Sequence, residues 1–256
     1  MMGGMPDGLG FFLQSADMAR DPDETAKRLL AGGATHAYVL TSSVDGRFQP
    51  VERVGKIVGA LLAHNIRPAL YMFPVDADLA AHERHLDECV LATGVVDVCA
   101  DLEPFGQTAE ALRRSQPPED ADHDWGAQEI GSLVARLRSK GYRVSISVFP
   151  RKRWKQFDWR EILEVHEVEV LLQLYQSLGG DTVKLERELA FWRDQDIRVI
   201  VCAGAYLGDA ARFRRDLHIA EEHSTVARIV VWALGSCDKS ELAVALQFVV
   251  EAWPVP

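Results

Sequence analysis

Apolar positions along the chain form short runs that alternate with longer segments of helical spacing. Eight of these runs are rich in β-branched and aromatic residues, which is typical of strands. They cover residues 9–15, 35–42, 67–74, 95–103, 142–150, 168–176, 197–206 and 228–236. The segments between them have a different period: from Val51 to Leu62, for example, apolar residues recur about every 3.6 positions, which predicts an amphipathic helix.

Residues typical of helix ends mark several of the helical segments. Asp21 followed by Pro22 predicts a capped helix start, and Gly32-Gly33 predicts its end. The stretches 158–161 and 238–241 both have an acidic cap followed three positions later by Glu, the spacing of a capping box. The longest irregular insertion is the polar stretch between Glu103 and Ile130.

Eight strands that alternate with eight helices predict an α/β protein, a single (β/α)8 TIM barrel domain over residues 1–256. An open doubly wound sheet is the alternative fold. No glycine-rich phosphate loop follows the first strand, however, so the usual argument for a dinucleotide-binding sheet is missing.

The fourth predicted strand, 95–103, carries three carboxylates, Asp97, Asp101 and Glu103, all at odd positions. Alternate residues of a barrel strand point inward, and the even positions of this strand are apolar, so the carboxylates should form one inward column. Burying a carboxylate costs several kcal/mol unless it is paired or protonated.

Glu103 would lie at the C-terminal rim, where barrel enzymes place their chemistry, with Asp101 one layer beneath it. A close carboxyl pair raises one pKa, which suits a general acid. We therefore expect a functional pair. The alternative is a structural ion-pair layer with Arg or Lys from another strand, but Arg67 and Arg143 stand at strand starts, the opposite end.

Aromatic and neutral hydrogen-bonding side chains recur at the other strand ends. They are Tyr71 and Phe73 in the third strand, Ser145, Ser147 and Phe149 in the fifth, Gln173 and Tyr175 in the sixth, and Trp232 in the eighth. Aromatic faces stack on sugar rings and the polar groups bond sugar hydroxyls, so this set predicts a carbohydrate site. A lone aromatic residue in a strand is more often a core residue.

Asp101-Leu102-Glu103 resembles the fourth-strand signature of glycoside hydrolase families 18 and 25, the chitinase- and lysozyme-like barrels. The resemblance implies that Glu103 is the general acid/base and that Asp101 orients the substrate N-acetyl group, whose carbonyl acts as nucleophile. Gln173-Leu174-Tyr175 resembles the sixth-strand segment that holds this group, and Trp232 the residue that stacks on a sugar. The run 69–73 resembles a third-strand segment of family 25.

The chain also differs from both families. Cys99 stands where family 18 has another Asp, and the first strand lacks the Asp of family 25, Asp17 being the nearest acid. Strand seven ends without the carboxylate of an ordinary retaining barrel glycosidase, which favours assistance by the substrate's N-acetyl group. An inverting mechanism would need a distant base such as Asp17, Asp76, Asp78 or Asp238, of which Asp78 and Asp238 stand at helix-cap positions.

The net charge of −10 argues against nucleic-acid or anionic-membrane partners, so a carbohydrate polymer is the expected partner. The first residues have neither a basic start nor a long apolar stretch. We therefore expect no signal peptide, and a protein that is cytoplasmic or released by lysis or a dedicated secretion system.

We expect no cofactor and no metal. The four cysteines show no metal-binding spacing and are predicted to be reduced thiols. His82, His85, His166, His218 and His223 fall on predicted helices and are expected at the surface.

The sequence thus predicts a hydrolase of β-linked N-acetylated polymers such as peptidoglycan or chitin. One alternative is a non-catalytic carbohydrate-binding or structural barrel in a larger assembly. The other is a metal- or phosphate-dependent barrel enzyme, in which Gly204 and Gly208 near strand seven could bind phosphate.

Overall fold

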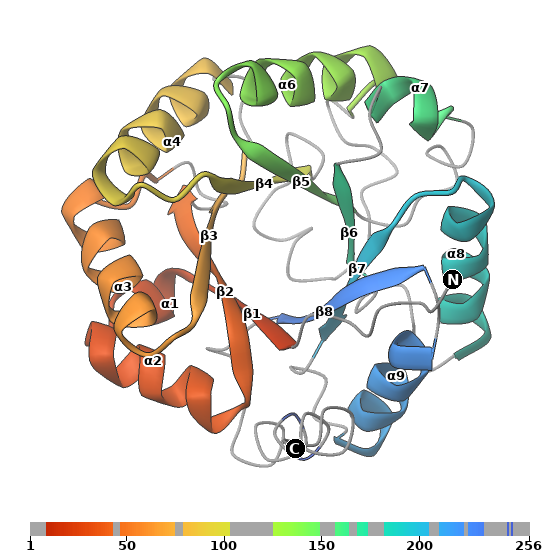
Figure 1. The fold of residues 1–256 in the computed structure, drawn as a ribbon, viewed down its shortest axis with the longest axis horizontal. Coiled ribbons are helices and arrows are strands. Elements are labelled where there is room, and N and C mark those ends of the chain that lie inside the picture. Colours follow the sequence, from red (N-terminus) through yellow and green to blue (C-terminus); the bar gives the residue numbers. More distant parts are fainter. Residues whose placement is uncertain are drawn as a thin grey trace.

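Eight strands form one closed, all-parallel barrel in which each strand pairs with the next and the eighth pairs with the first (Figure 1). The computed structural model describes residues 9–42, 47–74, 79–102, 125–148, 157–163, 168–173, 182–204, 210–222, 225–232, 245 and 247. The strands are β1 (Leu9–Leu13), β2 (Ala34–Ser42), β3 (Arg67–Met72), β4 (Asp97–Leu102), β5 (Arg143–Val148), β6 (Glu169–Gln173), β7 (Val199–Gly204) and β8 (Val226–Trp232). The predicted TIM barrel is confirmed, and the open-sheet alternative is wrong because Leu9 of β1 pairs with Ile229 of β8.

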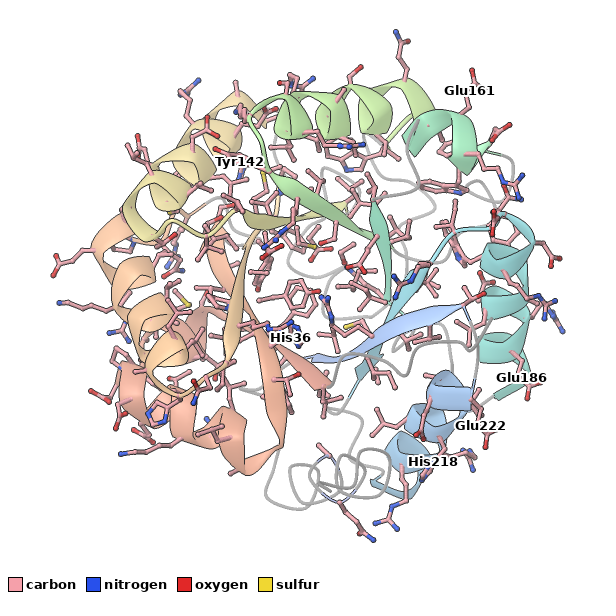
Figure 2. All side chains as sticks on the ribbon, viewed as in Figure 1. His36, Tyr142, Glu161, Glu186, His218 and Glu222 are labelled. Carbon is pink, nitrogen blue, oxygen red and sulfur yellow. The ribbon has the colours of Figure 1, made fainter. Side chains whose placement is uncertain are left out.

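Helices surround the ring of strands on its outside (Figure 1). They are α1 (Ser15–Met18), α2 (Pro22–Ala31), α3 (Val51–Ala63), α4 (Leu79–Thr93), α6 (Ala127–Ser139), α7 (Trp159–Leu163), α8 (Thr182–Asp194) and α9 (Ala210–Glu222). Acidic side chains such as Glu161, Glu186 and Glu222 lie on these outer helices (Figure 2). Within the described segments, no helix is both long and apolar enough to span a membrane.

The predicted helix starts follow from capping. Asp21 Oδ1 accepts hydrogen bonds from the backbone N–H groups of Asp23 and Glu24, at 3.0 and 3.1 Å, and Pro22 is the first residue of α2. Asp158 caps α7 in the same way. Gly94 and Gly141, with φ of 72° and 84°, follow α4 and α6 closely and allow the turn into the next strand. The predicted cap Asp238 lies outside the described residues.

The barrel interior beside β1 is filled by three aromatic rings. Phe12 stacks on Tyr38 at a centroid distance of 4.7 Å and meets Tyr71 edge-on at 4.9 Å. The Tyr71 hydroxyl donates a 2.9 Å hydrogen bond to the Leu13 carbonyl of β1. Rings from the first three strands therefore close this part of the barrel.

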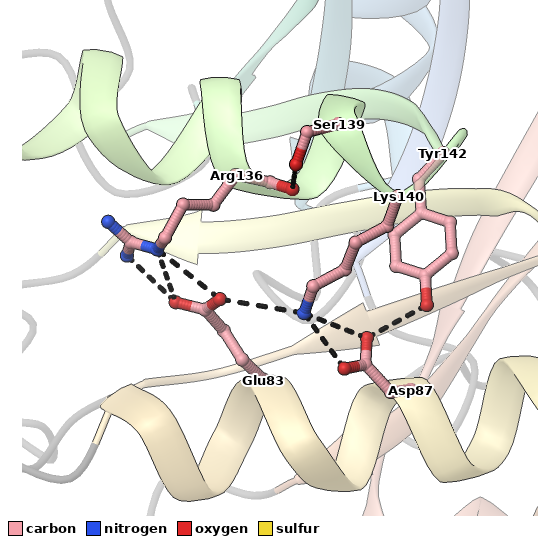
Figure 3. Close-up of polar contacts among 6 residues, drawn as sticks. All are labelled: Glu83, Asp87, Arg136, Ser139, Lys140 and Tyr142. Atoms are coloured by element: carbon pink, nitrogen blue, oxygen red, sulfur yellow. Dashed lines mark hydrogen bonds and ion pairs between the residues drawn. The ribbon is translucent and has the colours of Figure 1, made fainter.

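A polar network joins α4 to α6 on the outside of the barrel (Figure 3). Glu83 accepts hydrogen bonds from the Arg136 guanidinium, the shortest at 2.8 Å, and its carboxylate lies 3.7 Å from Lys140. Asp87 accepts from Lys140 and from the Tyr142 hydroxyl, each at 2.8 Å. Because α4 packs on β2 and β3 and α6 packs on β5, the network ties together the helices that cover these strands.

Two sequence predictions concern the histidines and the cysteines. His82, predicted at the surface, is instead buried: its Nδ1 lies 2.8 Å from Ser42 Oγ at the end of β2. The helical period alone could not show that α4 turns His82 toward the barrel. Cys89, Cys99 and Cys202 are buried free thiols, as predicted, and Cys237 lies outside the described residues.

Candidate functional site

Three polar side chains meet inside the barrel near the C-terminal ends of adjacent strands. Asp101 and Ser147 are the penultimate residues of β4 and β5, and Gln173 is the last residue of β6. All three are fully buried. We call this set the β4–β6 polar cluster. It lies at the end of the barrel where enzymes of this fold place their chemistry.

The Gln173 side-chain amide connects the cluster. Its Nε2 donates one hydrogen bond to Asp101 Oδ1 and another, of 2.7 Å, to Ser147 Oγ. A primary amide has two N–H donors, so a single side chain serves both neighbours. The strand order brings these groups together, because Asp101 pairs in register with Ser147 and β6 is the next strand.

The Asp101 carboxyl influences the groups around it. Burial, and next the Asp101 carboxyl, raise the pKa of the Tyr71 hydroxyl well above its ordinary value. The same two causes, in the same order, raise the pKa of the Cys202 thiol. Burial and then Asp101 also raise the pKa of Cys99, one layer below. Both thiols therefore stay protonated at neutral pH and are poor nucleophiles.

The inward direction predicted for Asp101 agrees with these contacts. Val98, Ala100 and Leu102 alternate with it and are buried, which fits packing against the helices. Ser147, named among the polar groups of the fifth predicted strand, contacts Gln173. Strand alternation predicts a polar layer inside the barrel. It does not predict the hydrogen bonds from Gln173, because the register of β4 relative to β6 is set only when the barrel closes.

Asp97 lies at the other end of β4, as its first residue. Its two carboxylate oxygens accept hydrogen bonds from the Nε and Nη2 groups of Arg143. Asp97 and Asp101 are four positions apart along the strand, about 13 Å at the usual rise. The structure therefore does not bring Asp97 together with the β4–β6 polar cluster, and the ion-pair alternative describes this lower position.

The predicted aromatic residues are only partly described. Tyr71 and Phe73 are both buried, and the Phe73 N–H donates to Ser42 Oγ at 3.2 Å. Trp232 is the last residue of β8, but its side chain lies outside the described part. Glu103, Phe149 and Tyr175 lie outside the described residues, Glu103 immediately after the end of β4.

Asp17, considered as a distant base, is buried in α1. Its Oδ2 accepts a hydrogen bond from the Gln14 N–H at 3.1 Å, and Arg28 Nη1 lies 3.9 Å from Oδ1. These contacts make it a helix-capping residue. Asp76 and Asp78 fall outside the described residues. In the described part of the chain, no three His, Cys, Asp or Glu side chains are grouped closely enough to hold a metal ion.

A further polar group at the end of β2 was not expected from the sequence. The Ser42 hydroxyl bonds both the Phe73 N–H and the His82 ring, and so links β2, β3 and α4. Nearby, Thr41 donates to the Tyr71 carbonyl at 2.8 Å. Ser42 and Thr41 are fully buried. This group supports the strand ends next to the β4–β6 polar cluster.

Solved structures with the same barrel include carbohydrate-active enzymes. A glycoside hydrolase family 18 chitinase from Flavobacterium johnsoniae matches with a TM-score of 0.65 and 10% identity over 97% of this chain and 95% of its own. A mannanase catalytic domain from Streptomyces sp. SirexAA-E matches with a TM-score of 0.59 and 15% identity over 90% of this chain and 74% of its own.

The same fold also occurs in an enzyme of another kind. A 3-keto-D-glucoside 4-epimerase from E. coli matches with a TM-score of 0.53 and 11% identity over 95% of this chain and 97% of its own. No model of a known protein family and no characterised protein matches the sequence. At these identities the likeness shows the fold, and the chemistry has to be argued from the site.

Proposed function

We propose that this chain is a glycoside hydrolase that acts on β-linked, N-acetylated sugar polymers such as chitin or peptidoglycan. The observation that carries the proposal is the Asp101 carboxyl, fully buried at the C-terminal end of β4 and held by Gln173. A barrel stabilised only by packing would place a branched apolar residue there. Burial of a carboxyl in this layer is costly, and it is best explained by a role in chemistry.

In the proposed mechanism Glu103, two residues after Asp101, is the general acid. It protonates the glycosidic oxygen as the bond to the anomeric carbon breaks, and the carbonyl oxygen of the substrate's N-acetyl group forms a new bond to that carbon. The Glu103 carboxylate then takes a proton from water, which attacks the anomeric carbon and displaces the N-acetyl oxygen. The product retains its anomeric configuration.

Asp101 assists in this scheme by orienting the N-acetyl group and tuning Glu103 through their proximity. Gln173 and Tyr175 hold the reacting centre, and Gln173 also fixes Asp101 through its amide. Trp232, Phe73 and Phe149 supply aromatic contacts to the sugar, and Tyr71, packed against Phe12, supports this layer from the barrel interior. Substrate assistance suits this chain because β7 carries no carboxylate that could act as the nucleophile of an ordinary retaining enzyme.

A second candidate is a non-catalytic sugar-binding barrel. It is favoured by Cys99, a buried thiol whose pKa is raised by burial, at a position where family 18 chitinases carry an acid. Such a protein would bind the polymer through the same aromatic residues but would not cleave it, and replacing Glu103 would leave binding unchanged.

The test compares wild type with Glu103→Gln and Asp101→Asn on N-acetylglucosamine oligomers and on peptidoglycan. Removal of a general acid lowers kcat by roughly 10²- to 10⁴-fold. Glu186→Gln, an exposed residue of α8, is the matched control for loss of one carboxylate and should keep full activity. Circular dichroism spectra establish that each variant is folded.

The outcomes separate the candidates. Cleavage that disappears in Glu103→Gln, with a retained anomer detected by NMR, supports the proposal. Binding without cleavage by wild type supports the sugar-binding alternative. Neither binding nor cleavage of either polymer rules out the proposed substrate. EDTA should leave cleavage unchanged, and a loss of activity in EDTA would favour a metal-dependent enzyme instead.

A further inference from the structure

A cavity of about 840 Å³ lies at the N-terminal ends of the strands, the opposite end of the barrel from the β4–β6 polar cluster. Its walls include the first residues of β3, β4, β5 and β6, together with His36 and Tyr38 of β2. His36 lies inside the ring of strands (Figure 2). This end of a TIM barrel ordinarily serves stability, so a cavity of this size calls for its own explanation.

Arginine dominates the charge of this cavity, which we call the arginine cavity. Five arginines line it: Arg67, Arg138, Arg143, Arg198 and Arg228. Asp97 and Glu169 are the carboxylates on its walls. The excess of positive charge contrasts with the net charge of −10 for the whole chain. Positive charge is thus concentrated in the arginine cavity.

Two of the arginines are held by the two carboxylates. Arg143 donates two hydrogen bonds to Asp97. Arg228 Nη2 lies 3.8 Å from Glu169, and its Nη1 donates to the Tyr38 hydroxyl at 3.3 Å. These contacts fix two guanidinium groups and use both carboxylates of the cavity walls.

Arg67 and Arg198 also line the cavity. Each stands next to the start of a strand, Arg67 as the first residue of β3 and Arg198 just before β7, and both side chains are exposed. Neither forms an ion pair with any residue that the structure describes. They approach the cavity from different strands, so one small ligand with two or more anionic groups could contact both.

The chemistry of these groups indicates the ligand. A guanidinium group presents a planar fork of donors that pairs bidentately with phosphate or carboxylate. Charges of one sign in a concave, low-dielectric place attract small ions of the opposite sign. A volume of about 840 Å³ lies in the range of small-molecule pockets and exceeds what a single inorganic ion needs.

The geometry points to a binding site for a small polyanion, carrying at least two phosphate or carboxylate groups, in the arginine cavity. Arg67 and Arg198 contact the anionic groups directly, while Arg143 and Arg228 line the walls in fixed positions. The site is separate from the proposed sugar site and does not depend on the hydrolase function. Because the ligand contacts the starts of several strands, it also stabilises the closed barrel.

The test is isothermal titration of the full chain at low ionic strength with tripolyphosphate and, separately, with citrate. We expect saturable binding and a rise in Tm with ligand concentration. Arg67→Gln and Arg198→Gln should each weaken binding by roughly tenfold or more, as expected for loss of a charged hydrogen bond. Both residues are exposed, so these variants should fold, and their Tm without ligand should match wild type.

The matched control is Arg187→Gln, which removes an exposed arginine from the outer helix α8. It should bind both anions as wild type does. Tighter binding of tripolyphosphate identifies a phosphorylated ligand, and tighter binding of citrate a polycarboxylate. The proposal is overturned if neither anion binds, or if Arg187→Gln weakens binding as much as the two cavity variants do.

Discussion

The side-chain amide of Gln173 donates a hydrogen bond to the Asp101 carboxyl, joining β6 to β4 across the buried interior of the barrel. Ser147 of the intervening strand receives the other amide hydrogen at 2.7 Å. The carboxyl before Glu103 therefore has its position set by a residue 72 positions later in the chain.

Loss of the Gln173 amide should destabilise the protein. In Gln173→Leu the buried Asp101 carboxyl loses a donor, which should cost about 2 to 3 kcal/mol of unfolding free energy. Urea denaturation measures the change. Ser145→Ala is the control, since it removes a half-buried hydroxyl whose bond to the Val98 carbonyl is 3.3 Å long, and it should cost about 1 kcal/mol or less. Equal costs for both variants would contradict the special role of Gln173.

A carboxyl in place of the Gln173 amide should make this cost depend on pH. In Gln173→Glu two buried carboxyls lie side by side, which raises the pKa of one of them in the folded state. The loss of stability relative to wild type should therefore be small near pH 4 and grow as pH rises through the range where the unfolded glutamate ionises. A loss that is the same at pH 4 and pH 7 would show that the two carboxyls do not interact.

The network between α4 and α6 should contribute measurably to stability. Glu83→Gln weakens the contacts with Arg136 and Lys140 and should cost about 1 kcal/mol, discounted for the partial exposure of Arg136. High salt should shrink this cost. Glu52→Gln is the control, because its pair with Lys56 is exposed and screened by solvent, so it should contribute less. If Glu83→Gln lowers the unfolding free energy no more than the control does, the network does not stabilise the fold.

The cap of α2 offers a test of the local contribution to the fold. Asp21→Ala removes the acceptor for two backbone N–H groups and should cost about 1 kcal/mol. Asp21→Asn keeps an oxygen acceptor and should retain most of the stability. Thermal and urea unfolding of the two variants measure the difference, and equal losses would mean that charge, rather than the cap itself, is what matters.

Stability should fall at alkaline pH. Burial raises the pKa of Tyr71 and of Cys202, and it raises that of Cys89 to about 11. Burial and the hydrogen bond to Asp87 raise the pKa of Tyr142 to about 12. The unfolded chain releases these protons at lower pH, because its thiols have a pKa of about 8.5 and its phenols a pKa of about 10. The unfolding free energy should therefore decrease as pH rises above about 9.

Urea midpoints between pH 7 and pH 11 measure this decrease. Tyr142→Phe removes one phenol, so its midpoint should fall less steeply than that of wild type above pH 10, with parallel behaviour between pH 7 and pH 9. A reductant keeps the thiols free throughout. Constant stability from pH 8 to pH 11 would contradict the raised pKa values.

Much of the fold could be derived from local pattern. Alternation of strand runs and helical segments predicted eight strands, and caps such as Asp21 and Asp158 marked helix starts, because these signals depend on neighbouring residues in the chain. The same alternation placed Asp101 on the inward face of β4. These predictions needed no knowledge of which strands meet.

Tertiary structure alone decided which side chains come together. The bonds from Gln173 to Asp101 and from Tyr71 to Leu13 depend on the register of the closed barrel, which local pattern does not contain. The burial of His82 depends on how α4 is rotated against β2 and β3. The arginine cavity joins residues from six strands and from α6, which come together only once the ring is complete. Sequence period determines which face a residue takes, and closure of the barrel determines what that face meets.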